Sequence, residues 1–206
     1  MASWIDHVVL AAATLEAGIA HVEALTGVAP VFGGRHEGNG THNALLSLGA
    51  PSYLEVLAPD PEQNAPSALL GETALDTPRL HAFAVGCDDL DAAVVALRAG
   101  GVDAVGDPFA MQRRGPDGTE LAWRLAFVGS TVGGARPFLI EWGSTPSPAE
   151  TAVLGGRLVS LTAGDPHPDE ARLPLDVLGV DVAVTESSTP WLRVIVAVDS
   201  RTIELT

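Results

Sequence analysis

One order of hydrophobic segments and turns occurs twice along this 206-residue chain, and this duplication constrains the fold more than any other feature. In each copy a short apolar strand leads into an amphipathic helix, and three further strand-like segments follow. A single unit of this kind leaves one face of its sheet exposed, and a second copy can cover that face. The sequence therefore predicts an α+β fold built from tandem βαβββ modules.

Caps and turns set the limits of the predicted elements. Thr14 is a predicted helix N-cap, Gly27 a helix stop, and Pro116-Asp117-Gly118 a turn. The first unit is expected to contain strands at 4–11, 31–32, 42–48 and 52–58, with a helix at 15–25. The second is expected to contain strands at 80–86, 107–113, 120–128 and 136–142, with a helix at 88–99.

The remainder of the chain repeats the same order in a compressed form. Its predicted elements are a strand at 157–163, a helix at 168–178, and strands at 181–186, 191–198 and 201–205. Pro-rich and Gly-rich segments at 59–78 and 143–150 separate the units. We therefore divide the chain into a first module with its linker (1–75), a second module (76–146) and a smaller C-terminal unit (147–206). The last unit is expected to be structural, covering an edge or extending the sheet.

Composition narrows the classes of partner. The chain has 26 acidic residues, 11 arginines and no lysine, for a net charge of -15, so its field repels nucleic acid. Its single cysteine, Cys87, allows no internal disulfide, which fits a reducing cytoplasmic setting. No apolar stretch approaches the ~20 residues needed to cross a bilayer. We expect a cytoplasmic protein that binds a small-molecule substrate, with neither nucleic acid nor membrane as a partner; the composition also allows a homodimer.

Each of the two longer units opens with a histidine and closes with a glutamate. These residues are His7 and Glu55 in the first unit and His81 and Glu141 in the second, and all four interrupt apolar strands. A charge in such a strand is costly unless a cation or a hydrogen-bonding partner compensates it. If the units are related by a pseudo-twofold axis, the four side chains can meet and hold a divalent metal. Buried ion pairs with arginine, or an empty polar pocket, are the alternatives.

Four short motifs, in this order, resemble a known group. They are Ile5-Asp6-His7-Val8-Val9, Gly40-Thr41-His42-Asn43, Tyr53-Leu54-Glu55-Val56 and the segment 117–126, which reads DGTELAWRLA. Together with the duplication, they are similar to the glyoxalase-like domain branch of the vicinal-oxygen-chelate superfamily, which includes glyoxalase I, extradiol dioxygenases, epimerases and bleomycin-resistance proteins. The resemblance implies a cupped, eight-stranded mixed sheet around a central cleft.

The same resemblance implies a ligand set and a chemistry. It assigns one divalent metal (Ni, Zn, Mn, Fe or Co) to His7, Glu55, His81 and Glu141, with open positions for two substrate oxygens. It implies a lyase or isomerase that stabilises an enediolate-like anion, with Glu55 or Glu141 as the base. A two-His, two-carboxylate set argues against dioxygen activation, which uses one carboxylate.

Three further residues are predicted to contact the substrate. Asn43 and His42 follow a glycine-rich bend that could close over the cleft, and Arg124 could bind a substrate carboxylate. The competing hypothesis is a non-catalytic protein of the same fold that binds a small cationic drug, for which an acidic cleft would be suited. A third is a decayed relative in which the acids pair with arginines.

Overall fold

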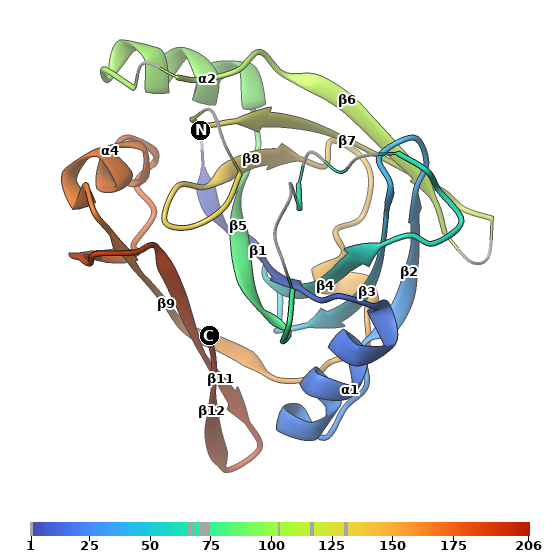
Figure 1. Ribbon diagram of the computed structural model, residues 1–206. Coiled ribbons are helices and arrows are strands. Elements are labelled where there is room, and N and C mark those ends of the chain that lie inside the picture. The colour runs from blue at the N-terminus through green and yellow to red at the C-terminus, as the bar shows by residue number, and fades with distance from the viewer. Residues whose placement is uncertain are drawn as a thin grey trace.

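The computed structural model describes residues 2–65, 67, 69–70, 75–102, 104–115, 118–129 and 132–206 (Figure 1). The first module comprises β1 (Ser3–Ala11), α1 (Leu15–Thr26), β2 (Val31–His36), β3 (Thr41–Ser47) and β4 (Tyr53–Pro59). The second comprises β5 (Arg79–Cys87), α2 (Leu90–Ala99), β6 (Phe109–Arg114), β7 (Glu120–Phe127) and β8 (Phe138–Glu141). The predicted β-α-β-β-β order is confirmed in both. Pro116 and Asp117 of the predicted turn lie outside the described residues.

The strands of the two modules close into one barrel in the order β1-β4-β3-β2-β6-β7-β8-β5. The modules meet along the antiparallel pair β1–β5 and, among the described residues, at one paired position between β2 and β6. Each module contributes one parallel pair, β1–β4 and β5–β8, so the sheet is mixed. The predicted eight-stranded mixed sheet is confirmed, and its closure leaves the barrel without a free edge.

Local sequence explains where the two long helices of the modules begin and how closely one of them packs. The side chain of Thr14 accepts a hydrogen bond from the backbone of Ala17 at the start of α1, and Asp89 caps α2 in the same way. Gly27 ends α1 in the left-handed conformation. Gly18 lies directly against Val56 of β4, where a methyl group would collide with the valine. α1 therefore packs on the barrel at a distance that only glycine allows.

The C-terminal unit follows α3 (Pro148–Thr151) and forms a separate four-stranded sheet in the order β10-β9-β11-β12. Its elements are β9 (Arg157–Asp165), α4 (Pro168–Leu178), β10 (Ala183–Glu186), β11 (Trp191–Val198) and β12 (Arg201–Leu205). The four strands of the unit form their own sheet and do not extend the barrel sheet, so that expectation is wrong, although Leu154 in the segment before β9 forms a β-bridge with Ser47 of β3. It packs β11 against β5 and α4 against α2, beside the barrel (Figure 1). A closed barrel has no edge to protect, whereas its apolar outer face still needs cover.

Alternation along the strands separates two hydrophobic cores. The outer core lies between the barrel, its helices and the C-terminal sheet, and includes Phe83 and Val85 of β5. The inner core fills the barrel and includes Ala82 and Ala84 of the same strand. Because successive side chains point to opposite faces, a residue's parity along its strand decides which core it joins. No described helix is both long and apolar enough to span a membrane.

Candidate active site inside the barrel

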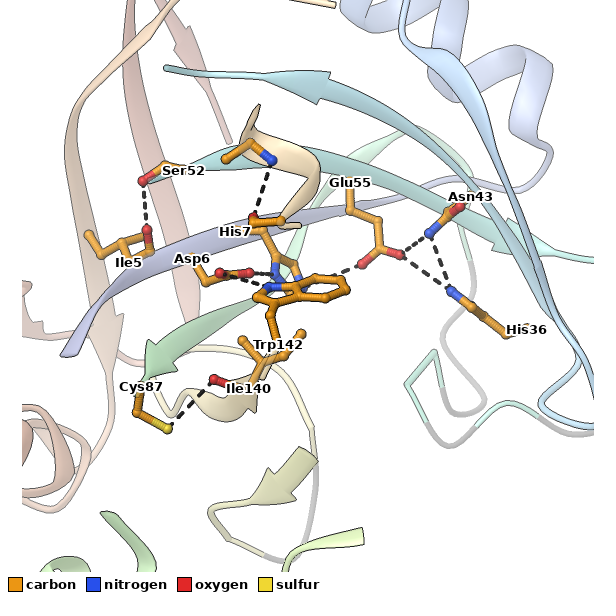
Figure 2. A network of polar contacts seen from close by, with 12 residues as sticks. Ile5, Asp6, His7, His36, Asn43, Ser52, Glu55, Cys87, Ile140 and Trp142 are labelled. Atoms are coloured by element: carbon orange, nitrogen blue, oxygen red, sulfur yellow. Dashed lines mark hydrogen bonds and ion pairs between the residues drawn. The ribbon is translucent and has the colours of Figure 1, made fainter. Parts of the chain in front are cut away.

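His7 of β1 and Glu55 of β4 face each other inside the barrel, on adjacent parallel strands (Figure 2). The His7 Nε2 atom lies 3.5 Å from Glu55 Oε2, and both side chains are buried, with 4% and 7% of their surface exposed. The His7 ring stacks on Tyr53, with 4.6 Å between ring centroids. The predicted first-module pair is thus brought together, in a setting that excludes bulk water.

Asp6 fixes the orientation of His7 from the opposite side. Its carboxylate is fully buried, and its Oδ1 atom accepts a hydrogen bond of 2.7 Å from His7 Nδ1. Its Oδ2 atom accepts a second bond, of 3.1 Å, from Trp142 Nε1. A register shift in the β1–β5 pairing skips Asp6, and such a bulge re-aims a side chain. Nδ1 therefore donates to Asp6, and the His7 Nε2 atom faces Glu55.

A second polar chain holds Glu55 from the β2–β3 side. Asn43 Nδ2 donates to Glu55 Oε1 at 2.6 Å and lies 3.3 Å from His36 Nε2. An amide nitrogen can only donate, so His36 Nε2 accepts and His36 Nδ1 donates to Thr41 Oγ1 at 2.9 Å. Asn43 Oδ1 in turn accepts from Arg113 Nη1 at 2.8 Å. The network fixes both the amide orientation and the histidine tautomer.

Burial shifts the pKa values of three groups that line this site. Burial lowers the pKa of His36, although the neighbouring Glu55 carboxylate opposes the shift, so His36 is neutral near pH 7 as its hydrogen bonds require. Burial also raises the pKa of Tyr53 well above its ordinary range, which keeps the phenol protonated. Desolvation lowers the pKa of Arg113, and Glu55 opposes that shift. Arg113 stays charged and supplies a buried cation beside Glu55.

The other two predicted metal ligands do not join this site. His81 donates its Nε2–H to the carbonyl oxygen of Leu69 at 2.7 Å. Glu141 pairs with Arg124, with 3.1 Å between Oε2 and Nη1, and accepts a weak 3.4 Å bond from the backbone of Leu90. The structure therefore places His81 and Glu141 apart from His7 and Glu55, and the four-ligand site stays a prediction. Glu141 follows Ile140, which belongs to the inner core, so alternation turns the glutamate to the outer face.

Apolar side chains occupy the inward positions of the second module that could have completed a metal site. These are Ala82 and Ala84 on β5 and Phe138 and Ile140 on β8. Proteins of the superfamily commonly bind a divalent metal. In the described part of this chain, however, no three His, Cys, Asp or Glu side chains are arranged to hold one. Of the four predicted ligands, His7 and Glu55 lie together inside the barrel, and two donors are too few for the predicted four-ligand centre.

The predicted substrate contacts also divide between the two faces. Asn43 lies inside the barrel within the network described above. His42 points to the outer face, where its ring meets Phe32 edge-on with 6.4 Å between centroids. Arg124 forms two hydrogen bonds to Asp91 of α2, at 2.8 and 2.9 Å, in addition to its pair with Glu141. Among the three, Asn43 alone lies beside Glu55.

A cavity of about 30 Å³ lies at the centre of the network. His7, His36, Asn43, Glu55 and Arg113 supply its polar wall, and inner-core side chains supply the rest. A space of this size admits only a few atoms, which is enough for a reacting group but not for a whole substrate. The site thus combines two potential bases, a buried cation and an apolar wall.

Three of these groups were not predicted from the sequence to belong to one site. Asp6 interrupts the apolar run beside His7, and that unusual placement was the available signal. His36 lies in the glycine-rich segment that was expected to be a bend, but the segment continues β2 and places His36 beside Asn43. Arg113 is one of two adjacent arginines, and its 5% exposure could not be read from the sequence.

A closed barrel of paired βαβββ modules with polar groups inside defines a protein of the vicinal-oxygen-chelate superfamily. The family model described as "Glyoxalase-like domain" matches residues 5–179, and the chain belongs to this family. No curated protein matches the chain by sequence.

Several solved structures are similar to this chain. A crystal structure of a hypothetical protein from Staphylococcus aureus is similar over 99% of this chain and 84% of its own, with a TM-score of 0.66 and 17% identity. A hypothetical protein from Bacillus halodurans gives a TM-score of 0.50 and 16% identity, over 71% of this chain and 97% of its own. Methylmalonyl-CoA epimerase from Streptomyces coelicolor, in complex with 2-nitronate-propionyl-CoA, is 26% identical over 70% of this chain and 97% of its own, with a TM-score of 0.47.

Proposed function

We propose that this protein is a glyoxalase-like enzyme of the isomerase or lyase type, acting on a small substrate with two vicinal oxygens. The observation that carries the proposal is the pair His7 Nε2 and Glu55 Oε2, two proton acceptors 3.5 Å apart in a buried cavity. Two acceptors at that separation can hold one proton between them and release it to a substrate. The pair is suited to moving a proton between neighbouring carbon atoms.

The remaining groups of the site have complementary roles in this proposal. Glu55 takes the proton from the carbon beside a substrate carbonyl, and the electron pair moves onto the oxygens to give an enediolate-like anion. Arg113 stabilises that negative charge, because its guanidinium carries five N–H donors and one of them binds Asn43. Asp6 positions His7 so that its Nε2 can receive the proton from Glu55 and return it to the adjacent carbon.

The divalent ion that the family resemblance implies has no part in these steps. Two of its predicted ligands, His7 and Glu55, lie together inside the barrel, whereas the other two, His81 and Glu141, have partners elsewhere. The four-ligand centre therefore remains a prediction for direct test. The cationic-drug hypothesis stays an alternative, because the carboxylates of Asp6 and Glu55 adjoin the site together with the Arg113 cation.

Solvent deuterium exchange tests the proposal. The protein is incubated in D₂O with 2-oxo acids and 2-hydroxyketones, and loss of the proton beside the carbonyl is followed by NMR. We expect exchange that Glu55→Gln reduces by at least about 10²-fold, the usual range for a general base. Glu170→Gln removes an exposed carboxylate near Arg136 and is the matched control, with unchanged exchange.

Two further results would decide against the proposal. Ligand binding without any exchange would assign the chain to the non-catalytic binding class. Stoichiometric Ni²⁺, Zn²⁺ or Mn²⁺ binding that Glu141→Gln abolishes, with exchange lost in parallel, would restore the four-ligand site and overturn the metal-independent proton transfer.

A further inference from the structure

A larger groove adjoins the catalytic cavity. It has a volume of about 440 Å³, within the range of about 300–1,000 Å³ typical of small-ligand sites. Most of its wall is apolar and comes from β2, β3, β7 and the segment before α3. The apolar side chains are Val31, Phe32, Leu45, Leu121, Pro146 and Ala152. Such a surface binds hydrocarbon and excludes water.

Arg113 and Leu45 belong to both spaces and form the wall between them. Among the described residues that line the groove, Arg113 is the one that carries a charge. Its guanidinium is therefore located where an apolar groove meets the cavity that contains Glu55. A ligand that fills the groove would place its polar end at this cation.

The mouth of the groove is more apolar than a solvated surface needs to be. Val31, which pairs with Leu45, is 57% exposed, whereas the neighbouring Phe32 lines the groove but its ring contacts His42 on the outer face. Exposed apolar groups that adjoin a concave site are typical of ligand-binding surfaces. The cavity of about 30 Å³ beyond Arg113 holds only a reacting group, so the rest of a substrate requires a neighbouring space.

We propose that the groove binds the aliphatic chain of an amphipathic substrate, a straight-chain 2-oxo or 2-hydroxy carboxylic acid. The carboxylate binds Arg113, and the carbon that carries the exchangeable hydrogen faces Glu55; this carbon is C2 in a 2-hydroxy acid and C3 in a 2-oxo acid. The two carboxylates repel each other, which keeps the acid group of the substrate on the arginine and leaves that C–H group to the base. This assignment rests on the proposed function for the reaction, but the binding it predicts can be measured separately.

Calorimetric titration with a homologous series tests the groove directly. The probes are 2-oxobutanoate, 2-oxohexanoate and 2-oxooctanoate, titrated into the full chain. We expect Kd to fall by roughly fourfold for each added methylene, the effect of burying one such group. Thr151→Trp adds a large ring at an exposed position of the groove and should abolish this dependence, so that the three probes bind with similar Kd values. Glu150→Trp, at the exposed neighbouring position outside the groove lining, is the matched control.

A second variant covers the case in which the tryptophan perturbs folding. Leu121→Asp introduces a carboxylate into the groove and should weaken 2-oxooctanoate binding at least tenfold, with a thermal midpoint measured in parallel to confirm the fold. A Kd that is independent of chain length, or a chain-length effect that survives both variants, would overturn the assignment. Chain-length-dependent binding without deuterium exchange would confirm the groove and reject only the proposed catalysis.

Discussion

Replacement of Asp6 by leucine should be among the most destabilising single changes in the barrel interior. The Asp6 carboxylate has no exposed surface and accepts from His7 Nδ1 at 2.7 Å and from Trp142 Nε1 at 3.1 Å. Leucine has the same branching at Cγ but is larger and accepts no hydrogen bond, so two buried polar groups lose their partner. Asp6→Asn should cost less than Asp6→Leu, because an amide can accept from Trp142 and donate to His7 Nδ1 once the imidazole changes tautomer.

The magnitude follows from the two unpaired nitrogens. Each buried group without a partner costs about 2 kcal/mol. The gain from no longer burying a carboxylate offsets part of that sum, which leaves a loss of about 3 kcal/mol in the free energy of unfolding. With an m-value of about 2 kcal/mol/M, the urea midpoint should fall by about 1.5 M.

The assay is urea unfolding at pH 7, followed by tryptophan fluorescence and by circular dichroism. Asp91→Leu is the matched control, because Asp91 is exposed and its two hydrogen bonds to Arg124 are in contact with water. If Asp6→Leu moved the midpoint no further than Asp91→Leu does, the assignment of Asp6 as the buried anchor of His7 would be refuted.

Three other predictions concern separate parts of the molecule. Burial lowers the pKa of His36 below its ordinary value of 6.5, so the stabilisation that the neutral imidazole gives is complete above pH 6.5 and is lost as the pH falls. The urea midpoint should therefore fall less steeply between pH 7 and pH 5 in His36→Gln than in the wild type. Burial raises the pKa of Cys87 to about 12, so a thiol reagent at pH 8 should modify it only after unfolding, and rapid modification of the native protein would contradict its packing. Gly18→Ala should lower the free energy of unfolding by about 1–3 kcal/mol despite the higher helix propensity of alanine, because the new methyl group collides with Val56. The comparison variant Ala17→Gly, at an exposed position of the same helix, should lower it by about 1 kcal/mol through helix propensity alone.

The order of the elements could be predicted because it depends on local signals. Thr14, Gly27 and the apolar spacing between them specify a helix within one segment, and the structure confirms α1 there. Duplication then indicated that two modules would share one sheet. The position of the C-terminal unit depends on which surface remains uncovered after the barrel closes, and no local pattern in residues 147–206 carries that information.

The candidate site was predictable only in part. His7, Glu55 and Asn43 lie on the inward faces of β1, β4 and β3, and the structure brings them together. His81 and Glu141 have a similar position in their module but not the same orientation. A register shift in the β1–β5 pairing changes the face on which the His81 side chain lies. Glu141 follows the inward-facing Ile140, so its side chain lies on the opposite face.

The duplicated βαβββ order, the apolar strands and the polar residues that interrupt them can all be recognised in the amino-acid sequence. Which of those residues meet depends on how the strands pair in the folded chain, and that pairing also brings Asp6, His36 and Arg113 into the site. The physical reason is the two-residue period of a β-strand, in which a one-residue change in register moves a side chain to the other face of the sheet. Bulges and strand pairing set that register, and both depend on contacts between segments that are distant in the chain.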